Sequence, residues 1–234
     1  MVFEQVFDYH RRVASFSRAV ANAATLPDWT AEDYARAPAT GPELLPVHDA
    51  LAPLFPYGAP VRGSVLGLDS PGLALALLAP ASRAGSWCAV SGFPALGLAA
   101  VAEYGIALQR LIVLPDPGKQ WATVLATLLD GFDAILVRPP RQATGTEARR
   151  IAARARERRS TVVVLGDWPH QVDLRLRVER SRWEGLDHGY GRITGRCCEI
   201  VAVGRGAASR QRRVTTWLPP RGPSAEAGVP RLGP

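Results

Sequence analysis

Two glycines stand at the spacing of a phosphate-binding loop, between a short apolar strand and an apolar helix. In residues 62–79, RGSVLGLDSPGLALALLA, Gly67 and Gly72 match the pattern G-x-x-x-x-G. A working loop continues with lysine and serine or threonine, which hold the β- and γ-phosphates and the magnesium ion. Leu73 and Ala74 occupy those two positions here. The sequence therefore predicts a nucleotide-binding core, with these residues in a tight turn, that no longer performs nucleotide chemistry.

The other residues with reactive side chains form no familiar site. Cys88, Cys197 and Cys198 make no C-x-x-C pair, which favours buried or half-buried free thiols over a zinc site. The adjacent Cys197 and Cys198 are expected to alternate across a strand, one inward and one outward. Asp167 follows a strand but has no nucleophile or metal ligand nearby, so it is interpreted as a turn or cap residue. No metal and no cofactor are expected.

Alternating strands and helices must position these residues. The pattern predicts strands at 64–66, 87–90, 111–114, 134–137 and 161–165, with helices at 72–81, 96–104, 119–129 and 147–159. This alternation is typical of a parallel sheet flanked by helices. A half-exposed strand at 172–179 follows, and strands at 192–203 and 213–218 predict a closing antiparallel hairpin. The expected fold class is α/β, with a mostly parallel sheet and an N-terminal helix.

Composition divides the chain into four parts. Residues 1–26 are predicted to form a helix with an apolar stripe, which fits packing on the protein's own core or docking to a partner. Residues 27–60 are proline-rich and predict a connecting segment with short helical turns at most. Residues 61–218 form the predicted core. Residues 219–234, rich in proline, glycine and serine, predict a disordered tail.

The chain is basic, with a net charge of +7 and a pI of about 10. Lys119 is the sole lysine among 28 basic residues, a skew that a GC-rich genome produces without any function. One predicted helix nevertheless concentrates arginines, and they form a possible weak contact with DNA phosphates: Arg149, Arg150, Arg154, Arg156, Arg158 and Arg159. The alternative is a solvated helix face. No apolar run reaches the roughly 18 residues of a membrane span, and the first 25 residues do not read as a secretory signal, so a cytoplasmic protein is expected.

Four pieces of the sequence carry a resemblance: VLGLDSPGLALAL, YGIALQRLIVLPDPGKQWATVLATLL, DAILVRPP and GRCCEIVAVGRGAASRQRRVTTWLP. Over roughly residues 44–218, they resemble the RecA recombinase core and, most closely, the actinobacterial ImuA-type RecA-like accessory proteins of SOS mutagenesis. RecA has a catalytic glutamate after its second strand, where this chain has Ser91, Gly92 and Phe93. RecA's magnesium-side strand ends in aspartate, where this chain has Arg138. Because phosphoryl transfer depends on these groups, the resemblance implies a chain that is not an enzyme.

The resemblance implies a non-catalytic, RecA-like adaptor of the damage-induced translesion synthesis complex. Such an adaptor joins an inactive, ImuB-type, Y-family polymerase-like protein, which binds the sliding clamp, to an error-prone replicative-type DNA polymerase. It is expected to associate with the nucleoid when DNA is damaged. By resemblance, a partner segment adds to the sheet edge at 111–114, beside a groove lined by Leu111, Val113, Trp121, Val124, Leu125 and Leu128. The alternative for these residues is ordinary core packing.

Three other functions remain open. The first is a DNA-binding RecA paralogue that modulates recombinase filaments, although the segment GDWPHQVD is short for a DNA-binding loop of the RecA type. The second is a residual nucleotide binder, which Leu73 and Ala74 disfavour. The third is a division inhibitor, because one such inhibitor is distantly RecA-like.

Overall fold

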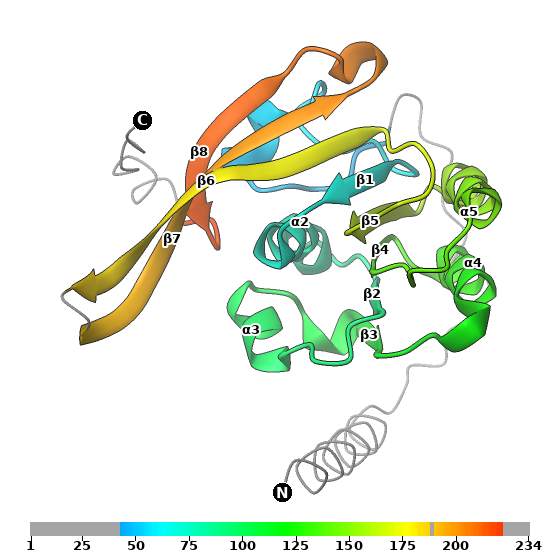
Figure 1. Cartoon of the computed structure of the whole chain (residues 1–234), viewed down its shortest axis with the longest axis horizontal. Helices are drawn as coiled ribbons and strands as arrows, with labels where there is room; N and C mark the ends of the chain where they lie inside the picture. The colour runs from blue at the N-terminus through cyan, green and yellow to red at the C-terminus, as the bar shows by residue number, and fades with distance from the viewer. Residues whose placement is uncertain (1–42, 188–189, 222–234) are drawn as a thin grey trace, which may run out of the picture. The chain divides into compact units, whose positions relative to one another are not determined.

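The computed structural model describes residues 43–187 and 190–221, which contain one eight-stranded mixed sheet (Figure 1). Its strands are β1 (Val65–Leu68), β2 (Cys88–Ser91), β3 (Leu111–Leu114), β4 (Ala134–Val137), β5 (Thr161–Leu165), β6 (Leu174–Asp187), β7 (Tyr190–Gly204) and β8 (Arg212–Leu218). They lie in the order β3-β2-β4-β5-β1-β6-β7-β8. β1 to β6 pair in parallel, whereas β7 runs antiparallel to both β6 and β8. This arrangement confirms the expected α/β class and is compatible with the RecA-like order of elements.

Helices cover both faces of the parallel strands. They are α2 (Pro71–Arg83), α3 (Leu98–Glu103), α4 (Trp121–Gly131) and α5 (Gly145–Arg158), with 3-10 turns η2 (Asp49–Leu54), η3 (Leu108–Arg110), η4 (Gly118–Gln120) and η5 (Gly206–Ala208). Side chains alternate across each strand. Leu66 and Leu68 of β1 therefore pack with α2 in one core, while Val65 packs with α4 and α5 in the other. β1, β2, β4 and β5 are buried along their whole length, which explains why their sequences are almost entirely apolar, with Ser91 and Thr161 as the polar exceptions.

Local signals fix the ends of two helices. The Ser70 side chain accepts a hydrogen bond from the Leu73 backbone N–H, and Pro71 opens α2, where its missing N–H costs nothing. α5 begins with a capping box between Thr144 and Glu147. None of the helices in residues 43–187 and 190–221 has the length and apolarity needed to cross a lipid bilayer.

The strand predictions for 111–114, 134–137 and 161–165 are confirmed residue for residue. The strand predicted at 87–90 lies one residue further along the chain, as β2, and the one predicted at 64–66 begins one residue later and ends two residues later, as β1. The bounds predicted for the strand at 172–179 were wrong: β6 begins at Leu174, runs to Asp187 and pairs with β7 along this whole length. The prediction stopped early because the pairing shifts register between Val178 and Arg180, which breaks the apolar–polar alternation.

The described part of the proline-rich segment packs into the core. Leu44 and Val61 form an antiparallel bridge, and the side chains of Leu45, Leu51 and Leu54 are buried. Residues 43–55 therefore contribute to the same core as α2. The predicted helix of residues 1–26 and the tail beyond residue 221 lie outside the described residues.

Candidate functional site

The connection between β1 and α2 is shorter than the sequence predicted. β1 continues through Leu68 and α2 begins at Pro71, so Asp69 and Ser70 alone lie between them. Gly67 lies inside β1, paired with Val164 and Arg175, and its assignment to the turn was wrong. A phosphate-binding loop presents successive backbone N–H groups around an anion. A two-residue connection has fewer of these groups to offer.

The two substituted loop positions point into the protein. Leu73 and Ala74 are fully buried in the core beneath α2. A packing contact explains Gly72, because a Cβ atom there would lie 2.6 Å from the Tyr104 hydroxyl oxygen. Gly72, Leu73 and Ala74 therefore serve the packing of α2 in this structure.

Beside the connection between β1 and α2, at the carboxyl ends of β2 and β4, an arginine stacks on an aromatic ring. Arg138, which follows β4, places its guanidinium carbon 4.6 Å from the centre of the Phe93 ring. The Arg138 backbone N–H donates to the Ser91 carbonyl. Gly92 has a φ of 84°, and a Cβ atom there would lie 2.5 Å from the Arg138 carbonyl oxygen, so this position requires glycine. Arg138 and Phe93, which follow the neighbouring strands β4 and β2, thus form a compact cation–π contact.

A cleft of about 1170 Å³ opens at the carboxyl ends of β1, β4 and β5, and we call it the carboxyl-edge cleft. Its charged lining residues are Arg138, Arg141, Arg175, Arg177, Asp69 and Asp167. None of the four arginines forms an ion pair with a described residue. The positive excess of the lining favours an anionic ligand. Asp167 lies in the loop after β5 and is exposed.

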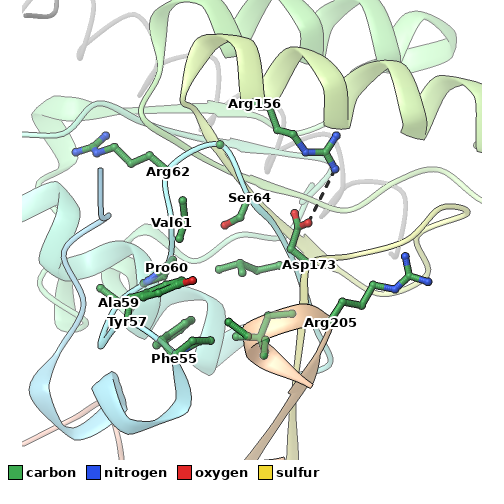
Figure 2. A pocket seen from close by; sticks show the side chains of 16 residues that line it. Phe55, Tyr57, Ala59, Pro60, Val61, Arg62, Ser64, Arg156, Asp173 and Arg205 are labelled. Atoms are coloured by element: carbon green, nitrogen blue, oxygen red, sulfur yellow. Dashed lines mark ion pairs between the residues drawn. The ribbon is translucent and has the colours of Figure 1, made fainter. Parts of the chain in front are cut away.

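A second, smaller cavity of about 340 Å³ lies at the opposite, amino edge of the sheet (Figure 2). Figure 2 shows the Asp173 carboxylate turned toward Arg156, with which it forms an ion pair at 3.9 Å. Asp173 also accepts a hydrogen bond of 2.7 Å from the Val65 backbone N–H, while Arg62 turns away to pair with Asp133. These charged groups hold β1 and its neighbours in place, so we assign this cavity a structural role.

β3 forms one edge of the sheet, as the sequence predicted. The Leu114 carbonyl accepts from the Gly92 N–H on the β2 side. Because parallel strands turn alternate residues to opposite sides, the N–H and C=O of Val113 face the open edge. Leu111 and Val113 are half-buried, and the side chain of Ile112 is 42% exposed. An apolar strand with free backbone groups therefore lies at the surface of the described residues.

The groove predicted beside this edge was wrong for three of its α4 residues. Trp121, Leu125 and Leu128 are buried in the core on that face of the sheet. The Trp121 ring packs edge-on against Trp168, with 6.2 Å between ring centres. Val124 is half-buried. The apolar face of α4 is used to cover the sheet, so the accessible part of the predicted site is β3 itself.

Most of the α5 arginines are paired with carboxylates. Asp130 binds Arg154 at 2.7 Å and Arg158 at 3.0 Å, and the hydrogen bond from Arg154 lowers the Asp130 pKa. Arg156 pairs with Asp173 at 3.9 Å, and Arg159 pairs with Glu43 at 3.3 Å. Arg149 and Arg150 are exposed and have no ion pair with a described residue. The predicted DNA-contact face is therefore largely neutralised.

Sequence reasoning missed the arginines of β6, namely Arg175, Arg177, Arg180 and Arg182. The alternation L-R-L-R at 174–177 is the signal that points to them, since it predicts one apolar and one basic face.

The cysteines show no sign of a reactive or metal-binding role. Cys88, Cys197 and Cys198 form no disulfide and are buried, which confirms the expected buried thiols. Burial raises the pKa of Cys88 to about 12, which keeps it protonated and unreactive. The expected outward position of one of the adjacent cysteines was wrong, because both faces of β7 are covered there. The described residues contain no cluster of three or more metal-ligating side chains.

Two comparisons with known proteins identify relatives. Residues 53–170, from η2 to the loop after β5, match the family described as MT3502 N-terminal domain. A similar protein is the uncharacterized protein Rv3395c of Mycobacterium tuberculosis, which is 36% identical over 166 residues. That match covers 66% of this chain and 80% of the relative. The chain therefore belongs to the family of the MT3502 N-terminal domain.

Proposed function

We propose that this chain is a non-catalytic adaptor of the damage-induced translesion synthesis complex. It joins an inactive Y-family polymerase-like protein, which binds the sliding clamp, to an error-prone replicative-type DNA polymerase. The resemblance of its motifs to ImuA-type proteins suggests the complex. The structural observation that supports an adaptor role is the open apolar edge of β3.

An open strand edge binds protein segments by a defined chemistry. A partner segment that lies alongside β3 pairs its backbone with the free N–H and C=O groups of Val113. Leu111 and Ile112 add apolar contact on the two faces of the new strand. Soluble proteins usually cover or charge such an edge, since it pairs readily with other chains. The absence of charged side chains from Leu111–Leu114 supports a role in binding.

The remains of the nucleotide site support a function without catalysis. The lysine and threonine positions of the loop are filled by Leu73 and Ala74, and both side chains lie in the core. Both residues lie inside α2, and the connection that precedes this helix is two residues long. Binding at the edge of β3 requires none of these groups.

Affinity purification of the tagged full chain from DNA-damaged cells tests the proposal. The informative variant is Ile112→Lys, which places a charge at the β3 edge. Its matched control is Ile193→Lys on β7, because Ile193 is similarly exposed, at 52% against 42%. We expect the wild type and Ile193→Lys to recover the two polymerase-type proteins and Ile112→Lys to lose them. Recovery of neither protein by the wild type would refute the adaptor role, and equal recovery by all three would move the interface away from β3.

The main alternative is a DNA-binding RecA paralogue that modulates recombinase filaments. It relied on the arginines of α5, of which Arg154, Arg156, Arg158 and Arg159 are paired with carboxylates. Recovery of the recombinase in place of the polymerase-type proteins would favour this alternative.

A further inference from the structure

Four arginines of β6 lie on the same face of the sheet: Arg175, Arg177, Arg180 and Arg182, which we call the β6 arginine row. Their cross-strand partners on β7 are Val203, Val201, Glu199 and Cys197. These partners are alternate residues of one strand, so they share a face. Residues directly opposite each other in an antiparallel pair also share a face. The four arginines are therefore aligned.

A β-bulge produces this alignment. In a regular strand, odd-numbered and even-numbered residues lie on opposite faces. Strict alternation would therefore place Arg180 and Arg182 on the opposite face from Arg175 and Arg177. The register shift between Val178 and Arg180 inserts Glu179 as an extra residue. After this residue, the even-numbered side chains lie on the face that the odd-numbered ones occupied before it. Without the bulge, the arginines would be split between the two faces.

The row carries uncompensated positive charge. Arg175, Arg177 and Arg182 form no ion pair with a described residue. Arg180 binds Glu199, and that carboxylate also holds Arg213 of β8. The guanidinium groups of Arg177 and Arg182, which have no ion pair with a described residue, thus lie on either side of the Arg180–Glu199 ion pair.

The row continues the carboxyl-edge cleft. Arg175 and Arg177 line the cleft, and Arg138 and Arg141 line it from the loop after β4. β6 then runs past the ends of the parallel strands together with β7, as Figure 1 shows. A linear ligand in the cleft would contact arginines of β6 on one side and of the loop after β4 on the other. Beyond the cleft it would contact the remaining arginines of the β6 arginine row.

We propose that the β6 arginine row and the carboxyl-edge cleft bind the phosphodiester backbone of a single-stranded nucleic acid. Same-face side chains of a strand are about 6.6 Å apart, so the row is roughly 20 Å long. A nucleic-acid backbone carries one phosphate per nucleotide at regular spacing, and guanidinium groups bind phosphate well. The row of arginines therefore matches such a backbone. An acidic peptide would also need pockets for its side chains. Of the four residues paired with the row, Val201, Glu199 and Cys197 are buried and Val203 alone is exposed, so little apolar surface beside the row is accessible to such side chains. This proposal does not depend on the adaptor function.

Fluorescence anisotropy of a labelled oligothymidylate with the purified full chain tests the proposal. The variant is Arg177→Glu/Arg182→Glu. Lys119→Glu/Arg210→Glu is the matched control, because it changes the charge equally at exposed basic residues that belong to neither the row nor the cleft and form no ion pair with a described residue. We expect the row variant to bind at least about tenfold more weakly, and the slope of log K against log salt to fall by about 1.4. The control should keep the wild-type slope.

Four outcomes would overturn the proposal. The first is no binding by the wild type, and the second is an equal loss in both variants, which would indicate diffuse charge attraction. The third is tighter binding to the corresponding duplex. The fourth is displacement of the oligonucleotide by polyglutamate at equal charge concentration, which would point to an acidic protein partner. Circular dichroism verifies folding, and Arg177→Gln/Arg182→Gln replaces the glutamate variant if that variant unfolds.

Discussion

The edge of β3 allows a substitution that removes one hydrogen-bond donor from the proposed partner-binding surface. Val113 turns its N–H and C=O to the open side, because the neighbouring Leu114 carbonyl is bonded to Gly92 on the β2 side. Val113→Pro deletes the free N–H and adds ring atoms where a partner strand would lie. An edge strand tolerates proline at a position whose N–H is not in the ladder. The fold should therefore survive while partner binding weakens.

The expected size of the effect follows from this geometry. One intermolecular hydrogen bond contributes about 0.5–1.5 kcal/mol net. With the steric obstruction by the ring, we expect a loss of about 1–2 kcal/mol, which is roughly a 5–30-fold increase in Kd. Isothermal titration calorimetry with the polymerase-like partner, once recovered, measures it. Val113→Thr keeps the N–H and the branched Cβ, and it should bind as the wild type does.

The position one residue earlier provides the contrasting case. Ile112 turns its backbone groups toward β2, so Ile112→Pro should break the ladder and lower the urea midpoint. Val113→Pro should leave that midpoint close to the wild-type value. Wild-type affinity in a folded Val113→Pro chain would refute strand addition at β3.

Two further predictions concern the fold. Gly72→Ala should destabilise the chain by about 1–3 kcal/mol, because its Cβ would lie 2.6 Å from the Tyr104 hydroxyl oxygen. Urea denaturation should show that Tyr104→Phe restores most of this loss, and a purely additive double-mutant cycle would contradict the contact. Glu199→Gln should destabilise the chain at neutral pH, because hydrogen bonds from Arg180 and Arg213 hold the Glu199 pKa below its ordinary value of 4.5. The ionised carboxylate stabilises the fold above that value, and this stabilisation is lost as pH falls through the folded-state pKa. The urea midpoints of the wild type and Glu199→Gln should therefore converge in acid. A difference between the midpoints that does not change with pH would exclude the ion pair as the cause.

The parallel core was predictable because its strands are short, apolar and clearly bounded. Three of them end at Pro115, Arg138 and Gly166, where apolar character stops. The hairpin of β6 and β7 was predicted only in part. Residues 179–185 of β6 are exposed or half-exposed, and the bulge removes the period of two on which strand prediction depends.

The candidate sites were less predictable than the fold. The spacing of Trp121, Leu125 and Leu128 identifies one face of a helix, but it cannot indicate whether that face covers the sheet or lines a groove. Whether the α5 arginines are neutralised depends on carboxylates that are distant in the sequence. Arg154 binds Asp130 across 24 residues and Arg159 binds Glu43 across 116. Such pairings follow from the fold and leave no local pattern in the sequence.

The proposed loss of a phosphate site is compatible with retention of the fold for a physical reason. The sheet is stabilised by strands buried on both faces, whereas phosphate binding depends on a few loop residues that add little to folding. Substitution of those residues leaves the β3 edge and the β6 face unchanged. β2, β4, β5 and β1 separate these two surfaces, which at about 4.8 Å per strand places them roughly 24 Å apart. A protein segment on β3 therefore leaves the β6 arginine row accessible, and one chain has room to hold a protein and a nucleic-acid strand together.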